Sequence, residues 1–363
     1  MDFSLSDDQQ AIADLAAQIF ADKATNERQR EVEQSGGPRF DRALWEEIAR
    51  AGLLGIPVPE AHGGAGLGFL EVAAILEQVG RATAPVPVLE TLVLGAMPLV
   101  RFGSEAQQAA WLPGAAQGEA VLTAALVEDA PTQATRDGQG WRLTGSKLCV
   151  PAAQVADVVL VPATAEDGPA IFLVDPRAEG VRLEELDTTS GQPEASLHLD
   201  AVAAGAGDRM EGAHLVDWMQ ERATAALCMV ALGACEASLE LTAEYAKTRK
   251  QFDQPIAMFQ AVGHRAADAY VDTEGVRLTA LQAAWRIASG RDAAKQVAVA
   301  KIWAAEAGKR VVHAAMHIHG GIGVDREYPL HRYFLYARQL ELTLGGGTPQ
   351  LLRLGGMLAA EEA

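Results

Sequence analysis

The chain has 363 residues, a formal net charge of −18 and a sequence pI of about 4.9. That length exceeds one ordinary hydrophobic core and predicts two or three domains. The acidic surface argues against nucleic acid and anionic membranes as partners, although a small anion needs only a local basic pocket. Three cysteines form no disulfide framework and favour a reducing cytoplasm. We find neither a signal peptide nor an apolar run long enough to span a membrane.

Residues 1–118 are expected to form a helical domain. The stretch 6–24 has apolar residues at helical spacing and Ser6 as a candidate N-cap. The stretch 44–56 repeats the pattern and leads into a turn rich in Pro and Gly. The stretch 104–119 predicts another short capped helix with a Pro-Gly stop.

Residues 119–205 are expected to form an antiparallel β-domain. Short runs rich in Val, Leu and Ile are separated here by Gly, Pro and Asp, as in a sheet or barrel. The stretch "DGQGWRLTGSK", residues 137–147, resembles the return of a hairpin.

Residues 206–363 are expected to form a four-helix bundle. His214 to Thr248 contains neither Gly nor Pro except Gly233 and would span roughly 50 Å as a helix. Two more long helical patterns and a shorter fourth follow, which predicts antiparallel packing. The fold class is therefore α+β, with clustered strands that exclude a Rossmann pattern. Neither GxGxxG nor a P-loop motif appears.

The stretch "YAKTRKQFDQPIAMFQAVGHRAAD", from Tyr245 to Asp268, is a candidate anion site. A cationic cluster that includes Arg249 ends the first helix, and Gln260 and His264 share one face of the next. An arginine at such a place suits a phosphate because its fork donates two hydrogen bonds. The alternative is that these cations only complement the helix dipole.

The stretch "HIHGGIGVDREYP", from His317 to Pro329, is a second candidate. Gly320, Gly321 and Gly323 would let backbone N–H groups approach a pyrophosphate. The alternative is a simple helix-ending turn with Gly at C′.

The two stretches together, about 70 residues apart, resemble the acyl-CoA dehydrogenase family. The resemblance covers nearly the whole chain and also includes "DFSLSDDQQ", "PEAHGGAGLG" and "GSKLCVPAAQVADVVLV". It implies an N-terminal helical domain, a middle β-domain and a C-terminal four-helix bundle. It also implies FAD as cofactor and oxidation of the Cα–Cβ bond of an acyl-CoA thioester. In this family the FAD lies across a subunit interface, with its flavin in one middle domain and its diphosphate against the partner's bundle.

The bundle half of this cofactor site is kept. By resemblance, the residues that would contact FAD are Arg249, Gln251, Phe252, Gln260, His317, Gly320 and Gly321. His317 replaces the amide side chain common in relatives and can still donate one hydrogen bond.

The flavin half departs from the family pattern. In the loop from Leu126 to Thr135 only Glu128 matches. Where relatives place an aromatic, an aliphatic and a hydroxyl residue beside the flavin, this chain has Cys149, Val150 and Pro151. The alternative is that these loops have drifted while FAD still binds.

The catalytic carboxylate is the sharpest departure, and we expect no catalytic residue in this chain. Gly346 stands where most relatives carry the Glu, and Ala223 stands at the alternative position on the long helix. Glu221 is a fallback, but two residues along a helix rotate a side chain by about 200°. Its alternative role is that of a solvated acid near a helix start. Neither a metal site nor hydrolase activity is expected, since the sequence has no HExxH spacing and no GxSxG motif.

The leading hypothesis is a cytoplasmic, non-catalytic subunit of an α2β2 dehydrogenase of the bacterial steroid type. Its partners would be a homologous subunit with the catalytic Glu, an acyl-CoA substrate and an electron-transferring flavoprotein. A second hypothesis is a self-sufficient homo-oligomeric acyl-CoA dehydrogenase with a relocated base. A third is a flavin-free structural or CoA-ester-binding subunit.

Overall fold

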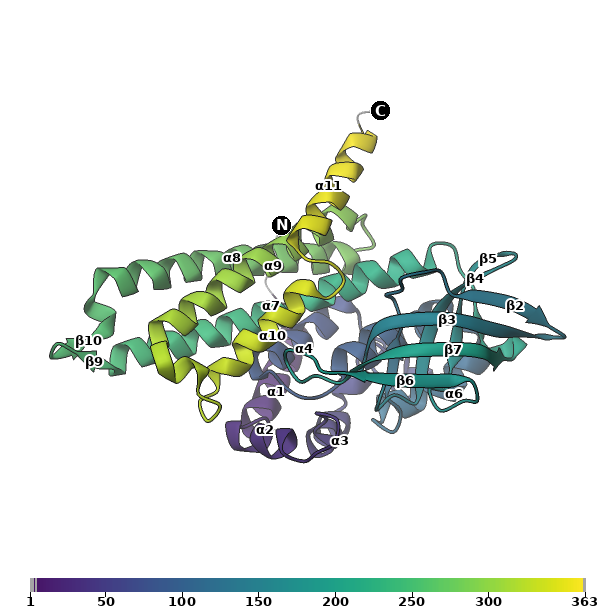
Figure 1. The fold of residues 1–363 in the computed structure, drawn as a ribbon, viewed down its shortest axis with the longest axis horizontal. Coiled ribbons are helices and arrows are strands. Elements are labelled where there is room, and N and C mark those ends of the chain that lie inside the picture. Colours follow the sequence, from purple (N-terminus) through teal and green to yellow (C-terminus); the bar gives the residue numbers. More distant parts are fainter. Residues whose placement is uncertain (1–2, 4, 362–363) are drawn as a thin grey trace. The chain divides into compact units, whose positions relative to one another are not determined.

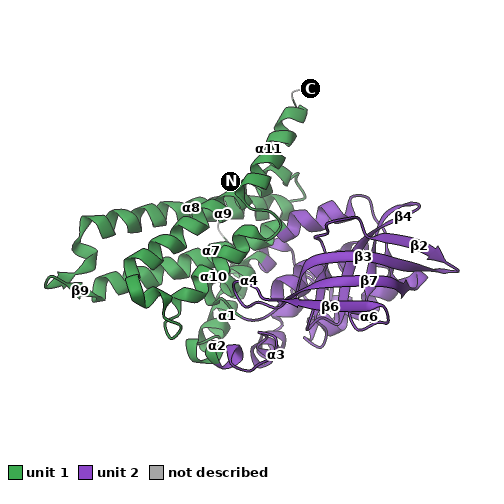
Figure 2. Ribbon diagram, in the orientation of Figure 1, with its two compact units in different colours: residues 1–30, 73–84, 224–363 green, residues 31–72, 85–223 purple. Residues whose placement is uncertain are grey.

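The computed structural model describes residue 3 and residues 5–361, and its contacts divide the chain into two compact units (Figure 2). Unit 1 comprises residues 1–30, 73–84 and 224–363, and unit 2 comprises residues 31–72 and 85–223. The boundaries of three domains near residues 118 and 205 stay a prediction.

Unit 1 is helical, and its long helices α7, α8 and α9 are the expected bundle helices (Figure 1). Helices α8, α10 and α11 each pack on α9. Ser6 caps α1 with a capping box to Gln9, as its sequence predicts. The helices that belong wholly or mainly to this unit are α1 (Asp7–Lys23), α2 (Asn26–Glu33), α4 (Phe69–Ala82), α7 (Leu215–Thr248), α8 (Gln260–Ala288), α9 (Ala294–His319), α10 (Leu330–Leu342) and α11 (Gly347–Glu361).

Two glycines let helices α4 and α7 cross with their backbones in contact. A Cβ added at Gly80 would lie 2.0 Å from the carbonyl oxygen of Val230, and one at Gly233 would lie 1.9 Å from that of Glu77. Neither position has room for any side chain. Gly233, the one glycine in the expected helix from His214 to Thr248, therefore marks a close helix approach.

A partly buried ionic network joins α4, α7 and α8 beside this crossing. Glu236 on α7 accepts from Arg81 at 2.7 Å and pairs with Arg277 at 2.6 Å. Arg81 also binds Glu240 at 2.6 Å. Glu77 is hydrogen-bonded to Glu236, and burial, followed by the negative charge of Glu236, raises the pKa of Glu77 to about 7. Two carboxyl groups that share one site hold a proton between them near neutral pH.

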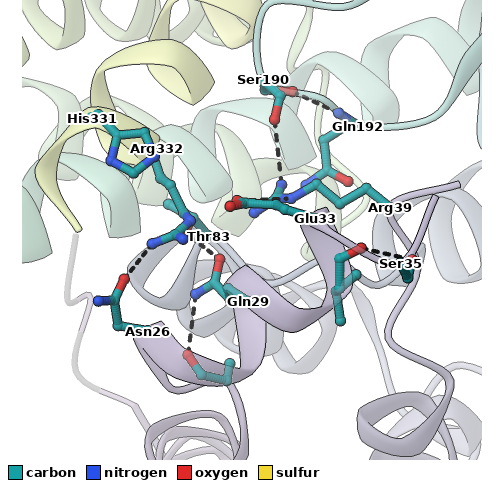
Figure 3. A network of polar contacts seen from close by, with 12 residues as sticks. Asn26, Gln29, Glu33, Ser35, Arg39, Thr83, Ser190, Gln192, His331 and Arg332 are labelled. Atoms are coloured by element: carbon teal, nitrogen blue, oxygen red, sulfur yellow. Dashed lines mark hydrogen bonds and ion pairs between the residues drawn. The ribbon is translucent and has the colours of Figure 1, made fainter. Parts of the chain in front are cut away.

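The N-terminal segment of unit 1 is fixed by side-chain hydrogen bonds (Figure 3). The Gln29 amide donates to the carbonyl of Ala82 at 2.8 Å and accepts from the Thr83 hydroxyl at 3.2 Å. Arg332 on α10 donates to the side-chain oxygen of Asn26. These bonds satisfy polar groups on α2, α4 and α10 at once.

Unit 2 contains a sheet in the order β6-β7-β3-β2-β4-β5-β8, with β1 paired to β4. The predicted hairpin is present, because Asp137 pairs with Gly140 across a two-residue turn. The sheet is mainly antiparallel, as expected, and the short strand β1 and the end of β2 also pair with β4 in parallel. The strands are β1 (Leu122–Ala124), β2 (Gln133–Asp137), β3 (Gly140–Pro151), β4 (Val158–Ala165), β5 (Gly168–Val174), β6 (Val181–Leu186), β7 (Glu194–Ala204) and β8 (Arg209–Met210).

The helical part of unit 2 contains a π-helix and a helix, α6, that is longer than expected. Helix α6 passes through Pro113 and Gly114 to Ala116, so the expected Pro-Gly stop was wrong. Pro113 lies near the C-terminal end, where only one turn of helix follows and the loss of one N–H bond is tolerated. The elements are α3 (Arg42–Arg50), the 3₁₀ turns η1 (Leu53–Gly55), η2 (Glu60–His62) and η4 (Ala206–Asp208), the π-helix η3 (Glu90–Ala96), α5 (Met97–Phe102) and α6 (Glu105–Ala116).

Among the described residues, one helix, α7, is long enough and apolar enough to cross a membrane. Of its most apolar 18-residue window, 78% is buried within the fold, as in the core helix of a soluble protein.

Candidate functional site

A tight hairpin after α7 presents an aromatic ring to solvent. Strands β9 (Lys250–Gln251) and β10 (Gln254–Pro255) pair antiparallel, and the turn residues Phe252 and Asp253 both have left-handed φ, at 53° and 62°. Such a turn favours Asn-Gly, so a bulky residue is strained here. Phe252 is nevertheless 88% exposed. Its ring packs edge-on against that of Phe259, with the two centroids 6.2 Å apart. A strained, exposed aromatic is typical of a binding surface.

Arg249 and Gln251 flank this ring on exposed backbone. The Arg249 N–H donates to the carbonyl of Tyr245 at 2.8 Å, and the Arg249 carbonyl accepts from Ile256 at 2.8 Å. Its backbone is therefore fixed, while no described ion pair in residues 5–361 uses its guanidinium. The Gln251 amide donates to the carbonyl of Lys250 at 2.8 Å, which leaves its oxygen toward solvent.

The glycine turn that follows α9 is open to close approach. Gly320 has φ +64° and ψ −139°, and a Cβ at Gly320 or Gly321 would meet no atom within 4 Å. The turn continues as the 3₁₀ helix η6 (Gly320–Val324). His317 is exposed in the last turn of α9, and Gln260 is exposed at the first position of α8. The open side of the glycines suits the approach of an anion to the backbone.

The structure links the hairpin and the glycine turn through residues that we did not single out from the sequence. The ring of Tyr245, one turn before Arg249, stacks on His319 with centroids 4.3 Å apart and planes 18° apart. His319 directly precedes the glycines. The seven predicted contact residues thus lie on the ends of α7 and α9 and the start of α8. Together they offer a free cation, amide groups, open backbone and an exposed ring, which fit a ligand with phosphates and an aromatic base.

The loop at Leu126–Thr135 in unit 2 is organised around an ion pair. Lys147 on β3 is 1% exposed and donates to the Glu128 carboxylate. The same carboxylate accepts from the N–H and the hydroxyl of Thr132, both at 3.1 Å. The ammonium of Lys147 and the hydrogen bonds from Thr132 oppose desolvation and hold the pKa of Glu128 below its usual value. Glu128 therefore fixes this loop and is not available as a base.

The end of β3 offers little for an aromatic ring to pack on. Cys149 is exposed and has a left-handed φ of 49°. Burial, and then the Glu194 carboxylate, raises the pKa of its thiol, so the neutral form is favoured. The carbonyl of Pro151 accepts from the Thr123 hydroxyl at 2.7 Å, and proline has no N–H to donate.

Gly346 lies in the turn between α10 and α11. Its neighbour Gly345 has the left-handed φ of 90°, and Gly346 does not. A Cβ at Gly346 would meet the carbonyl oxygen of Glu341 at 3.2 Å, a tight contact that a small shift relieves. Glu306 on α9 is an acid near this turn that the sequence did not indicate, since a Cβ at Gly347 would lie 2.5 Å from its Oε1. Room for a Cβ at Gly346 therefore depends on a small shift of the Glu341 carbonyl.

The alternative base position on α7 is also without an acid. Ala223 and Thr224 are each 1% exposed. Glu221 pairs with Arg222 at 3.3 Å and is only partly exposed, so the expectation of a solvated acid was wrong. The guanidinium of Arg222 lies over the Trp218 ring at 3.9 Å, which keeps the pair at the start of the helix. No group of His, Cys, Asp and Glu among the described residues is arranged to hold a metal ion.

Two family models match the chain. The model of the acyl-CoA dehydrogenase N-terminal domain matches residues 6–119, and that of the acyl-CoA dehydrogenase C-terminal domain matches residues 211–355.

Similar proteins match the chain over its whole length. It is 43% identical to the acyl-CoA dehydrogenase FadE27 of Mycobacterium tuberculosis over 100% of both chains. A chain of the ChsE4-ChsE5 complex from the same species is 44% identical over 99% of both chains, with a TM-score of 0.96. A chain of the Tcur3481-Tcur3483 steroid ACAD G363A variant is 43% identical over 99% of both, with a TM-score of 0.93.

Proposed function

Because the chain belongs to the acyl-CoA dehydrogenase family, we propose that it is the subunit of a heteromeric enzyme that lacks the catalytic Glu. It would lend FAD contacts to a homologous partner subunit that carries this Glu. The fold is the acyl-CoA dehydrogenase fold, and the cofactor is FAD.

The reaction needs a carboxylate within hydrogen-bond reach of the proton on Cα. FAD, when bound, accepts the hydride from Cβ. By resemblance to the family, Gly346 and Ala223 stand at the two positions where the carboxylate is expected, and neither can take a proton. The single observation that carries the proposal is the absence of an acid at both expected positions, combined with a bundle end that keeps the residues expected to contact FAD.

The bundle end supplies the chain's own contribution. Arg249, with its fixed backbone and free guanidinium, would bind the diphosphate bidentately. Gly320 and Gly321 would present backbone N–H groups to the same charge. Phe252, Gln251, Gln260 and His317 would enclose the remainder of the cofactor.

We propose further that the substrate is a steroid side-chain CoA ester, that electrons leave to an electron-transferring flavoprotein, and that the enzyme works in the cytoplasm. The similarity to a chain of a steroid ACAD complex supports the first part. The similarity to a chain of the ChsE4-ChsE5 complex supports a partner with a different sequence.

The test is to produce the chain alone and together with the homologous subunit, and to measure bound flavin and dehydrogenase activity. We expect activity in the co-produced complex only. Arg249→Met should lower its flavin content, whereas Arg50→Met, at an exposed arginine of unit 2 paired with Glu47, should not. A lone chain that binds one FAD per subunit and turns over acyl-CoA fully would refute the proposal.

The second candidate is a self-sufficient enzyme that uses Glu221. The ion pair with Arg222 argues against it, because a carboxylate held by a guanidinium is a weaker base. Glu221→Gln should leave the activity of the complex unchanged, and a loss of more than about 100-fold would favour this candidate. A complex that contains no FAD at all would favour the third candidate, a flavin-free subunit.

A further inference from the structure

We propose that a cluster of the buried His319 with the partly buried Tyr245 and Tyr328 is the positioning element of the FAD site at the bundle end. It would set Arg249 and the glycine turn at the spacing that the diphosphate requires. This inference rests on the proposed function of that site and assigns a role to three residues that are not among the seven expected FAD contacts.

His319 has a fixed tautomer. Its Nδ1 lies 2.9 Å from the carbonyl oxygen of Ala315, which can only accept, so Nδ1 carries the proton. Its Nε2 lies 3.0 Å from the Tyr328 hydroxyl and accepts from it when the ring is neutral. The ring is 4% exposed, and burial lowers the pKa of His319, which favours the neutral form that this pattern requires.

The hydrogen bond between His319 and Tyr328 joins the residue before the glycine turn to a residue shortly after it. His319 immediately precedes the turn, and Tyr328 lies four residues beyond its last residue, Val324. The backbone of Tyr328 is held in turn, because its N–H donates to Asp325 at 3.1 Å and its carbonyl accepts from His331 Nδ1 at 2.7 Å. The carbonyl of Glu327 also accepts from Asn26 at 2.8 Å, so loss of the His319–Tyr328 bond would loosen the turn mainly at residues 320–324.

Tyr245 extends the same cluster to the arginine. Its carbonyl accepts the N–H of Arg249, its ring stacks on His319, and its hydroxyl donates to the His319 carbonyl at 3.5 Å. The Tyr245 ring also lies edge-on to the Tyr328 ring, with the two centroids 6.5 Å apart. One aromatic cluster therefore holds both the end of α7 with Arg249 and the end of α9 with Gly320. Any change in its packing changes the relation of these two phosphate-binding elements.

The role of the cluster is testable by single substitutions that remove its hydrogen bonds. Tyr328→Phe deletes only the hydroxyl, and His319→Leu deletes both ring hydrogen bonds. His319→Gln keeps one donor and one acceptor and serves as the conservative variant. Tyr270→Phe, at an exposed tyrosine on α8, is the matched control. Each is produced with the homologous subunit, and the flavin-free complex is titrated with FAD while its Tm is recorded.

We expect Tyr328→Phe to weaken FAD binding about 2- to 10-fold, the effect of one lost hydrogen bond, with the Tm of the flavin-free complex nearly unchanged. His319→Leu should weaken it by about 10-fold or more, and His319→Gln by less. Hydrogen exchange at residues 320–324 should accelerate in the first two variants. Tyr270→Phe should match the wild type.

Two outcomes overturn the inference: FAD affinities within twofold of the wild type, or losses of affinity that merely follow an equal loss of Tm. Arg249→Met separates this from a failure of the proposed site. If Arg249→Met weakens FAD binding and the cluster variants do not, only the positioning role is wrong. If Arg249→Met has no effect, the assignment of the diphosphate site itself is wrong.

Discussion

The carboxyl pair of Glu77 and Glu236 predicts an unusual dependence of stability on pH. Arg81 and Arg277 both bind Glu236 and hold the negative charge there, so Glu77 carries the shared proton. The pKa of Glu77 rises from 4.5 to about 7 on folding. The folded state prefers the protonated form of Glu77. The contribution of this group to the free energy of unfolding therefore falls as the pH rises from about 4.5 to about 7, and it is constant above. The 2.5-unit shift corresponds to about 3 kcal/mol at pH 8.

Glu77→Gln removes this cost and keeps a hydrogen-bond donor for Glu236. We expect the variant to unfold like the wild type near pH 4.5 and to be more stable at pH 8, by up to about 3 kcal/mol. Thermal unfolding of both proteins in the same assembly, from pH 4.5 to pH 8.5, measures this difference. Glu46→Gln, at an exposed acid of unit 2, should show no such trend. A difference that does not change with pH, or a less stable variant at pH 8, would refute the reasoning.

Two further predictions concern glycines. Gly233→Ala should destabilise the protein by about 3 kcal/mol or prevent folding, because its Cβ would lie 1.9 Å from a backbone oxygen; denaturant unfolding measures this. Gly355→Ala, in α11 with no atom within 4 Å, should instead be neutral or stabilising by up to about 1 kcal/mol, and equal effects of the two would contradict the crossing geometry. Gly346→Glu should be tolerated, since only one carbonyl lies 3.2 Å from its Cβ. It should give the lone chain no dehydrogenase activity, because Cys149 and Pro151 still replace the flavin-facing residues; activity in the lone variant would show that its own flavin half is competent.

The helices could be predicted because their signals are local. The run after His214 lacks interior breakers other than Gly233, and the structure has one helix from Leu215 to Thr248. Ser6 followed by Gln9 is a capping box, whose two hydrogen bonds depend on four consecutive residues. Such features need no knowledge of distant parts of the chain.

The sheet was harder to predict, because its pairing depends on residues that lie far apart in the sequence. Strand β7 contains several alanines and an Asp, which have weak strand preference, and we did not predict it. It forms because β3 and β6 pair with its two edges, an effect of residues up to 63 positions away. The parallel pairing of β4 with β1 and β2 likewise follows from how the chain returns, which periodicity does not record.

The candidate site divides in the same way. Arg249 and the glycines could be named from their motifs, and the structure places them on exposed backbone at the ends of α7 and α9. His319 and Tyr245 could not, because their stacking joins residues 74 positions apart. A weak signal existed: Tyr245 lies one helical turn before Arg249, and His319 directly precedes two glycines. Assigning them a role still required the fold.

The composition of unit 1 from three separate chain segments has a consequence for synthesis on the ribosome. Residues 73–84 carry Gly80 and the buried face of α4, yet their packing partner begins at Thr224. About 140 residues must be translated in between, which takes roughly 7–28 s at bacterial elongation rates. Unit 2 is complete once its last residue, Ala223, has emerged, so it can fold before the remaining 140 residues of unit 1 have been made. The N-terminal helices, although made earliest, are thus among the last to reach their final packing.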